Sequence, residues 1–304
     1  MSQPWQSDAR RVANHIRTRV LELCLEKNGT YLSQALSSAE ILGALYVKVL
    51  HLAPLAKPLC TPMFTGTPGS HNPSPSGGRF HGEPGALYDR FLISPAHYAV
   101  GIYAALEAVG RLDRSAFMTF NEDGSTLEMI GAEHSPGFEL TTGSFGQALS
   151  QACGIAQARK VKGESGRTFV FISDGELEEG QTWEAAQAAA FFKLDKVHVF
   201  VDVNGQQYDG NTKDVMNIEP IDARFKAFGW NVHRVDGHDV EAIAGTAEME
   251  PNGKPTVTLC DTNTTQGIPY LDSRKPHLHY VRPKSEADVI ALKEALVNFK
   301  KGIA

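Results

Sequence analysis

The stretch FVFISDGELEEG, residues 169–180, runs from apolar residues directly into a row of acids. A second stretch, VHVFVDVNGQQYDG at residues 197–210, repeats the pattern, because another apolar run ends in polar residues and a glycine. Each apolar run has the length and the β-branched and aromatic content of a buried strand. We therefore expect two strands whose carboxyl ends carry polar groups, at Asp174 in the first and Asn204 in the second.

Strand and helix patterns alternate from the first of these stretches onward. Strands are expected at 167–173, 196–204, 230–236 and 254–262, and helices at 179–193 and 221–229. This alternation is typical of a parallel sheet with helices on both faces, which places the chain in the α/β class.

The amino-terminal half reads as helices separated by a long loop. Helical periodicity covers 8–27 and 37–50, and Ser37 with Glu40 has the spacing of a capping box. Further helices are expected from Pro95, after the glycine turn TTGSFG at 141–146, and over 285–301. Residues 52–85 are so rich in Pro, Gly, Ser and Thr that we expect no regular element there, but a lid, a binding loop or disorder. Since no internal repeat is visible, we expect one domain over residues 1–304.

Composition excludes some partners. The net charge of −6 gives no electrostatic reason to expect a nucleic acid or an anionic membrane as partner. No apolar stretch is long enough to span a membrane. The four cysteines lie far apart, without the spacing of a zinc knuckle or a disulfide framework. These features favour a cytoplasmic protein.

The two strand ends predict a cation site. A right-handed crossover between adjacent parallel strands places their carboxyl ends side by side, so Asp174 and Asn204 are expected to be neighbours. A carboxylate, a carboxamide and a backbone carbonyl in the turn after Asn204 are ligands that Mg²⁺ prefers. Gly175 lets the backbone approach closely, and a helix that starts near Glu179 would direct its positive end to the same place. Asp-Gly and Asn-Gly are each common turns on their own, whereas their combination at this spacing indicates a metal that holds a diphosphate.

The same stretches resemble the thiamine diphosphate signature of transketolases. The resemblance extends, in the family's order, over nearly all of the chain except 52–85, and is closest to the split-gene form in which the diphosphate-binding half is its own polypeptide. The stretches that carry it are SDGELEEGQTWEAA (173–186), KLDKVHVFVDVNGQQYDG (193–210), LSSAEILGALY (36–46), YDRFLISPAHYAVGIYAAL (88–106), SPGFELTTGSFGQALSQACGIA (135–156) and FKAFGWNVHRVDGHD (225–239).

The resemblance implies the thiamine diphosphate-binding fold and a set of site residues. The cofactors would be thiamine diphosphate and Mg²⁺, or Ca²⁺ or Mn²⁺ in its place. The expected metal ligands are Asp174, Asn204 and the backbone carbonyl of Gln206; the expected cofactor contacts are Gly143, Phe145, Asp174, Gly175, Glu179, Asn204, His97 and His279; and the expected catalytic residues are His97, His279 and Glu179. His277, two residues before His279, is the other candidate for the histidine that faces the thiazolium.

The resemblance also implies a partner chain and an activity. The pyrimidine-binding domain, which carries the catalytic glutamate, would be a separate carboxyl-terminal-half subunit in an α₂β₂ assembly, with Glu179 bonding across the interface. The expected reaction is transfer of a two-carbon ketol or acyl unit from a donor ketone to an acceptor aldehyde or ketone, with the chemistry carried by the cofactor.

Departures from the family pattern concern the substrate more than the cofactor. Tyr31 stands where a substrate histidine is expected, and Met129 or Ile130 stands where a second is expected. Ser173 replaces a glycine, and the loop at 52–85 is longer than usual. Loss of two hydroxyl-binding histidines favours a less hydroxylated donor such as a 2-oxo acid. Alternatively, sugar chemistry persists through substitutes, for which the candidates are Tyr31, His134, His71 and His81.

Two other functions stay open from the sequence. One is the decarboxylating component of a 2-oxo acid dehydrogenase, or an acyloin-type carboligase. The other is a scaffold that has kept the fold without activity, against which the intact Asp174, Glu179 and Asn204 argue.

Overall fold

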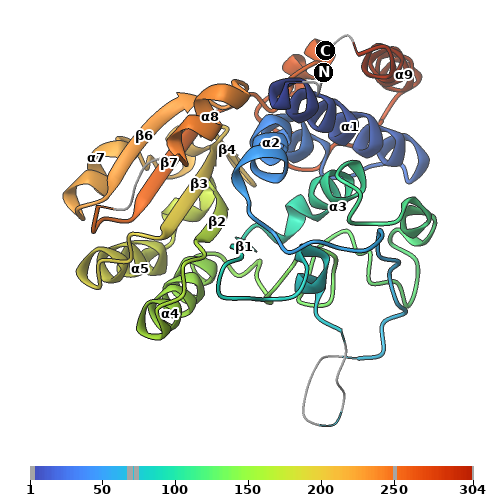
Figure 1. Cartoon of the computed structure of the whole chain (residues 1–304). Helices are drawn as coiled ribbons and strands as arrows, with labels where there is room; N and C mark the ends of the chain where they lie inside the picture. The colour runs from blue at the N-terminus through green and yellow to red at the C-terminus, as the bar shows by residue number, and fades with distance from the viewer. Residues whose placement is uncertain (1–3, 67–70, 72–74, 249–251, 303–304) are drawn as a thin grey trace.

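A five-stranded parallel sheet runs through the structure, a computed structural model that describes residues 4–66, 71, 75–248 and 252–302 (Figure 1). In spatial order its strands are β1 (Arg90–Ile93), β2 (Thr168–Ser173), β3 (Val197–Val203), β7 (Thr256–Asp261) and β6 (Asn231–Asp236). The predicted parallel α/β fold is therefore confirmed, as are the strands expected around 167–173, 196–204, 230–236 and 254–262. Strand β1 was not predicted, because it has only four residues and begins with an arginine.

The two faces of the sheet have separate cores, as the alternation of side chains along a strand requires. On β2, Phe169 and Phe171 face one core, whereas Val170 and Ile172 face the other. Helices α1 (Trp5–Glu26), α2 (Leu32–Ala44), α3 (Ala99–Ala108), α8 (Val240–Thr246) and α9 (Glu286–Lys300) contribute to the first core. Helices α4 (Gln147–Lys162), α5 (Gly180–Phe191) and α7 (Ile221–Ala227) contribute to the second. Helices thus cover both faces, as predicted (Figure 1).

The second amino-terminal helix begins earlier than predicted, so the proposed capping box is wrong. Helix α2 starts at Leu32, which places Ser37 and Glu40 inside it. The Ser37 hydroxyl donates to Asp202 at 2.6 Å, and Glu40 forms an ion pair with Arg17 of α1 at 2.5 Å. Both side chains therefore interact with residues that are distant in the chain. The helix passes into a π-helical turn over Leu45–Val49.

Other helix boundaries follow the predictions more closely. Pro95 precedes a 3-10 turn, Ala96–Tyr98, that leads into α3. Gly146, with φ of 85°, precedes α4 at the end of the predicted glycine turn. Helix α9 has a capping box between Ser285 and Asp288. The short helices α8 and α6 (Thr212–Val215) and the hairpin of β4 (Gln206–Gln207) with β5 (Gly210–Asn211) were not predicted.

The Pro/Gly-rich segment 52–85 lies partly outside the described residues. Its described parts contain a 3-10 turn, Gly77–His81, and isolated bridges from Leu59 to Leu112 and from Met63 to Ser125. These parts are therefore anchored to the segment after α3. Across the described chain, no helix has the length and apolar character needed to cross a membrane.

Candidate functional site

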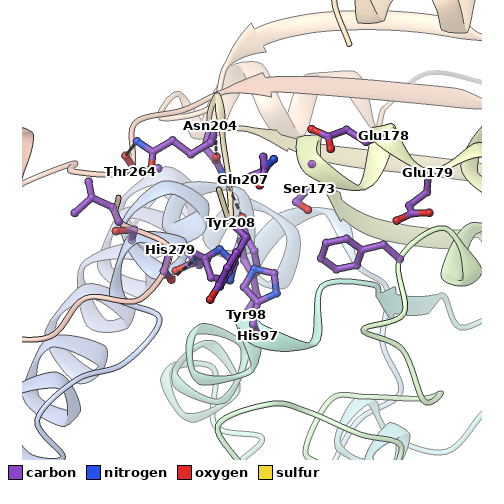
Figure 2. A pocket seen from close by; sticks show the side chains of 16 residues that line it. His97, Tyr98, Ser173, Glu178, Glu179, Asn204, Gln207, Tyr208, Thr264 and His279 are labelled. Atoms are coloured by element: carbon purple, nitrogen blue, oxygen red, sulfur yellow. Dashed lines mark hydrogen bonds between the residues drawn. The ribbon is translucent and has the colours of Figure 1, made fainter. Parts of the chain in front are cut away.

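A cavity of about 190 Å³ lies at the carboxyl ends of β2 and β3 (Figure 2). Most of the residues expected from the sequence to form the site line it. Those residues are His97, Phe145, Gly175, Glu179, Asn204, Gln206 and His279. Residues that sequence reasoning missed complete the lining: Ser33, Gln34, Tyr98, Glu178, Gln207, Tyr208, Thr264 and Leu278, together with Ser173.

The structure brings Asp174 against the turn that follows Asn204. The backbone N–H of Gly205 donates to Asp174 Oδ2 at 2.6 Å, and that of Gly175 donates to Oδ1 at 2.9 Å. The pairing of Ser173 with Asp202 in adjacent parallel strands produces this approach. The predicted proximity of the two strand ends is therefore confirmed.

Asp202 organises this edge of the sheet, although no sequence pattern singled it out. Its carboxylate is fully buried and accepts hydrogen bonds from neutral donors on several elements. The donors are the hydroxyls of Ser37 (2.6 Å), Tyr98 (2.6 Å) and Thr262, and the carboxamide of Asn204 (3.1 Å). Asp202 thus orients the Asn204 side chain, whose Oδ1 accepts from the Gln206 N–H at 3.0 Å.

Aromatic rings surround the two histidines of the site. The His97 ring lies 4.8 Å from that of His279 and 5.2 Å from that of Tyr31, measured between centroids. Tyr208, on the hairpin, lies 5.2 Å from His279. Burial and the neighbouring His279 lower the pKa of His97 to about 3, and burial lowers the pKa of His279. Both imidazoles are therefore neutral near pH 7, so each has one N–H donor and one acceptor nitrogen.

The glycine turn at 141–146 lies against the segment that precedes His97. The Gly143 N–H donates to the Ser94 carbonyl at 3.0 Å, and the Thr142 hydroxyl donates to the Ile93 carbonyl at 2.7 Å. Gly143 has φ of 95°, and a Cβ there would meet the Ala96 Cβ at 3.0 Å. Gly143 therefore packs beside the cavity wall without lining it, whereas Phe145 lines it.

The acidic run after β2 divides into buried and accessible members. Asp174 and Glu176 are buried, Glu178 is half-buried, and Glu179 is exposed at the start of α5. The predicted helix near Glu179 is confirmed, but a 3-10 turn over Asp174–Glu178 comes first. Glu179 therefore reaches the cavity from its exposed rim (Figure 2).

The hairpin of β4 and β5 forms another wall of the cavity. The Gln206 carboxamide donates to Thr264 Oγ1 at 3.1 Å. A Cβ at Gly175 would meet the Gln207 Cβ at 3.2 Å, so the absence of a side chain at 175 lets the hairpin lie close to the turn after β2. Tyr208 is mostly exposed at the hairpin.

The residues considered as substitutes for the missing histidines lie in different places. Tyr31 is part of the aromatic cluster, and Thr30 beside it contacts Met129. His134 instead contacts Glu128 at 3.1 Å and the Phe64 ring at 4.5 Å between centroids, and is not among the lining residues.

The loop histidines also differ from each other. His71 is exposed, whereas His81 is buried and shares a 2.9 Å hydrogen bond with the Tyr46 hydroxyl. His81 is therefore not a solvated loop residue, because Tyr46 and Glu139 enclose it, and it does not line the cavity.

The donor set at the strand ends fits a hard cation. Among the described residues, no group of three or more His, Cys, Asp and Glu side chains is placed to hold a metal. A cation here would depend on the Asp174 carboxylate, the Asn204 carboxamide and backbone carbonyls, which are all oxygen ligands. Burial and the nearby Asp202 raise the pKa of Asp174 well above its ordinary value. A divalent cation would favour the ionised form of this carboxylate.

Comparison with known proteins is consistent with this geometry. Residues 85–300 match the family described as transketolase, thiamine diphosphate binding domain. A putative uncharacterized transketolase family protein of Sinorhizobium fredii is 41% identical over 68% of this chain and 76% of its own length. One of the subunits of the apulose-4-phosphate transketolase of Actinobacillus succinogenes is 34% identical over 88% of this chain and 87% of its own.

Solved structures show the same fold. The transketolase of Campylobacter jejuni superposes on all of this chain with a TM-score of 0.75, at 21% identity. The chain covers 46% of that protein, so it spans about half the length of a solved transketolase.

Proposed function

The chain belongs to the transketolase family, and we propose that it is the diphosphate-binding subunit of a two-chain, thiamine diphosphate-dependent enzyme that transfers a two-carbon ketol unit. One observation carries the proposal: Asn204 and the neutral pair His97 and His279 line one cavity. Asp174 lies directly behind this wall and accepts from the backbone of the Asn204 turn. This arrangement provides oxygen ligands for a cation at one end and proton-bearing imidazoles at the other.

A partner subunit would supply the missing half. The chain spans about half of a solved transketolase, and the Actinobacillus relative, which it matches over most of its length, is itself named as one subunit of a transketolase. The partner would be a carboxyl-terminal-half chain with the pyrimidine-binding domain and its catalytic glutamate, in an α₂β₂ complex. The exposure of Glu179 at the cavity rim supports a contact with that chain.

Thiamine diphosphate would bind through a divalent cation, in the first instance Mg²⁺. Asp174, Asn204 and the Gln206 carbonyl would hold the cation, and Gly175 would let the diphosphate approach the backbone. Phe145 would contact the cofactor from the glycine turn, and Gly143 would support that turn. When bound, the cofactor supplies the carbon nucleophile on which transketolase chemistry depends.

The chain's own residues would bind the substrate and move protons. Neutral His97 and His279 can each donate to a substrate oxygen and accept from a hydroxyl at pH 7. The rings of Tyr31 and Tyr208 lie against His279 and limit the space beside it. A cytoplasmic location is part of this proposal.

The relatives favour ketol transfer from a sugar over acyl transfer from a 2-oxo acid. The Actinobacillus relative is named for apulose-4-phosphate, a sugar phosphate. Neither Tyr31 nor His134 lines the cavity, but the Tyr31 ring packs directly against the rings of His97 and His279. We therefore propose a ketose donor and an aldehyde acceptor, with Tyr31 rather than His134 in place of a missing histidine.

Titration calorimetry of the reconstituted two-chain complex tests the cofactor assignment. We expect thiamine diphosphate to bind only with Mg²⁺, and Asp174→Ala to abolish binding because the cation loses its charged ligand. Glu184→Gln, an exposed position on α5, is the control and should leave binding unchanged. Binding of equal strength in EDTA would contradict the metal assignment.

A donor screen then decides between the reactions. Ketose phosphates should be turned over, whereas turnover of 2-oxo acids alone, with release of carbon dioxide, would favour the decarboxylating alternative. Magnesium-dependent binding without turnover of any donor would favour an inactive scaffold.

A further inference from the structure

Glu176 is the most deeply buried acid of the run that follows β2. Its relative exposure is 0%, although it sits between residues that reach the cavity. The side chain does not line the cavity and has no role in the function proposed above. Its contacts nevertheless join the turn that carries Asp174 to the segments that carry His97 and Phe145.

One oxygen of this carboxylate joins two other segments. Glu176 Oε1 accepts from the Ser94 hydroxyl at 2.6 Å and from the Gly146 backbone N–H at 3.0 Å. Ser94 directly follows β1, three residues before His97, and Gly146 directly follows Phe145. Glu176 itself lies two residues after Asp174, in the same 3-10 turn.

The main chain around Glu176 is fixed as well. Its carbonyl accepts from the Glu179 N–H at 3.1 Å and from the Thr182 hydroxyl at 3.2 Å. The carbonyl of Glu176 is thus held by residues at the start of α5. The turn that carries Asp174 is therefore hydrogen-bonded to α5 through this carbonyl and to Ser94 and Gly146 through the carboxylate.

A role in packing alone does not explain a carboxylate here. Burying a carboxyl group costs free energy, and a leucine would fill a similar volume without that cost. Glu176 Oε2 is buried without a hydrogen-bond partner among the described residues, so the group is incompletely compensated. A leucine could not provide a hydrogen-bond acceptor. The Glu176 carboxylate provides one acceptor oxygen to a side-chain hydroxyl and a backbone amide, which come from two other segments.

We propose that Glu176 is a positioning residue, which holds the Ser94–His97 segment and the Phe145–Gly146 turn in register with Asp174 for cofactor binding. The proposal rests on the proposed function, because it concerns the same site. It adds that the relative placement of the three segments depends on one buried acceptor.

Hydrogen exchange and cofactor affinity test the proposal together, with three variants. Glu176→Leu removes the acceptor, Glu176→Gln keeps an acceptor oxygen, and Ser94→Ala removes one donor. Exchange of the Gly146 amide, followed in the full chain with its partner, requires no cofactor. Glu184→Gln serves as the control, since this exposed side chain lies outside the three segments.

The expected pattern separates positioning from a merely structural role. In Glu176→Leu, we expect Gly146 exchange to rise at least about tenfold and the Kd for Mg²⁺–thiamine diphosphate to rise at least about tenfold, or about 1.4 kcal/mol. Glu176→Gln should restore both to within about threefold of wild type. Ser94→Ala should weaken cofactor binding several-fold while changing Gly146 exchange little.

Other results would overturn the proposal. If Glu176→Leu folds with normal Gly146 exchange and normal affinity, or loses thermal stability without loss of affinity, Glu176 only packs. If that variant fails to fold, an unchanged Kd in Ser94→Ala gives the same negative answer. If the wild-type complex does not bind thiamine diphosphate while Gly146 exchange still responds to Glu176, the proposed function fails but the link between the segments stands.

Discussion

Two sets of buried acids differ in what holds them. At the carboxyl edge of the sheet, Asp174, Glu176 and Asp202 accept hydrogen bonds from backbone amides, hydroxyls and a carboxamide. Among the amino-terminal helices, Glu40 and Glu107 are instead paired with arginines and histidines. Both sets lie in the same layered fold, yet only the second is neutralised by the chain itself.

The pKa values of Asp174 and Glu176 differ from that of Glu40 in the same way. Burial raises the pKa of Asp174 well above its ordinary value and that of Glu176 to about 7. For Glu40, burial acts in the same direction, but Arg17 and His238 outweigh it and lower the pKa. The fold therefore penalises the ionised forms of Asp174 and Glu176, and an external cation would favour ionisation of Asp174. At Glu40, by contrast, the chain's own basic groups favour the ionised form.

The largest effect on stability is expected at Glu40. Glu40→Ala leaves the Arg17 guanidinium buried without its carboxylate partner, which typically costs about 3–5 kcal/mol. Urea unfolding should show this loss, while cofactor affinity of the folded variant should stay unchanged. Replacing both partners, with Arg17→Leu and Glu40→Leu, should recover much of the loss; no recovery would mean that the ion pair is not its cause.

The second paired acid, Glu107, should contribute to the free energy of unfolding in a way that depends on pH. Burial alone would raise its pKa, but hydrogen bonds from His15 and Arg19 outweigh burial and lower the pKa to about 2. Because the folded-state pKa is depressed, the stabilisation is present above pH 4.5 and is lost as the pH falls toward 2. Because solvent partly screens this half-buried group, the contribution is about 1–3 kcal/mol.

Urea unfolding across this pH range measures the contribution of Glu107. Glu107→Gln should be less stable than wild type at pH 6, and the difference should shrink as the pH approaches 2. A difference that is the same at every pH would contradict the ionic interpretation.

The smallest effect on stability, and the largest contrast with binding, is expected at Asp202. Asp202→Ala leaves the hydroxyls of Ser37, Tyr98 and Thr262 without this acceptor, at a cost of about 1–3 kcal/mol for each group. The variant also removes a buried carboxylate, and the desolvation cost of that carboxylate offsets much of this loss. The Asn204 carboxamide also loses the partner that orients it. Calorimetry should therefore show a rise in the Kd for Mg²⁺–thiamine diphosphate of more than about tenfold. A variant less stable than Glu40→Ala but with normal affinity would remove the distinction between the two sets.

The amino-acid sequence by itself determined the parallel α/β architecture and the meeting of Asp174 with the turn after Asn204. Both follow from local patterns, since apolar runs of strand length alternate with helical periodicity and the crossover between adjacent strands has a fixed hand. The resemblance to transketolases also indicated His97 and His279, whose rings lie side by side in the structure.

Only the tertiary structure decided which acids are buried and what they contact. In the run at 174–179 the acids look alike in sequence, but Glu176 is buried while Glu179 is exposed. The spacing of Ser37 and Glu40 matches a capping box locally. In the structure, however, Ser37 binds Asp202, which is 165 residues away, and Glu40 binds Arg17, which is 23 residues away. The physical reason is that burial and hydrogen-bond partners are set by segments far apart in the chain, which no local pattern records.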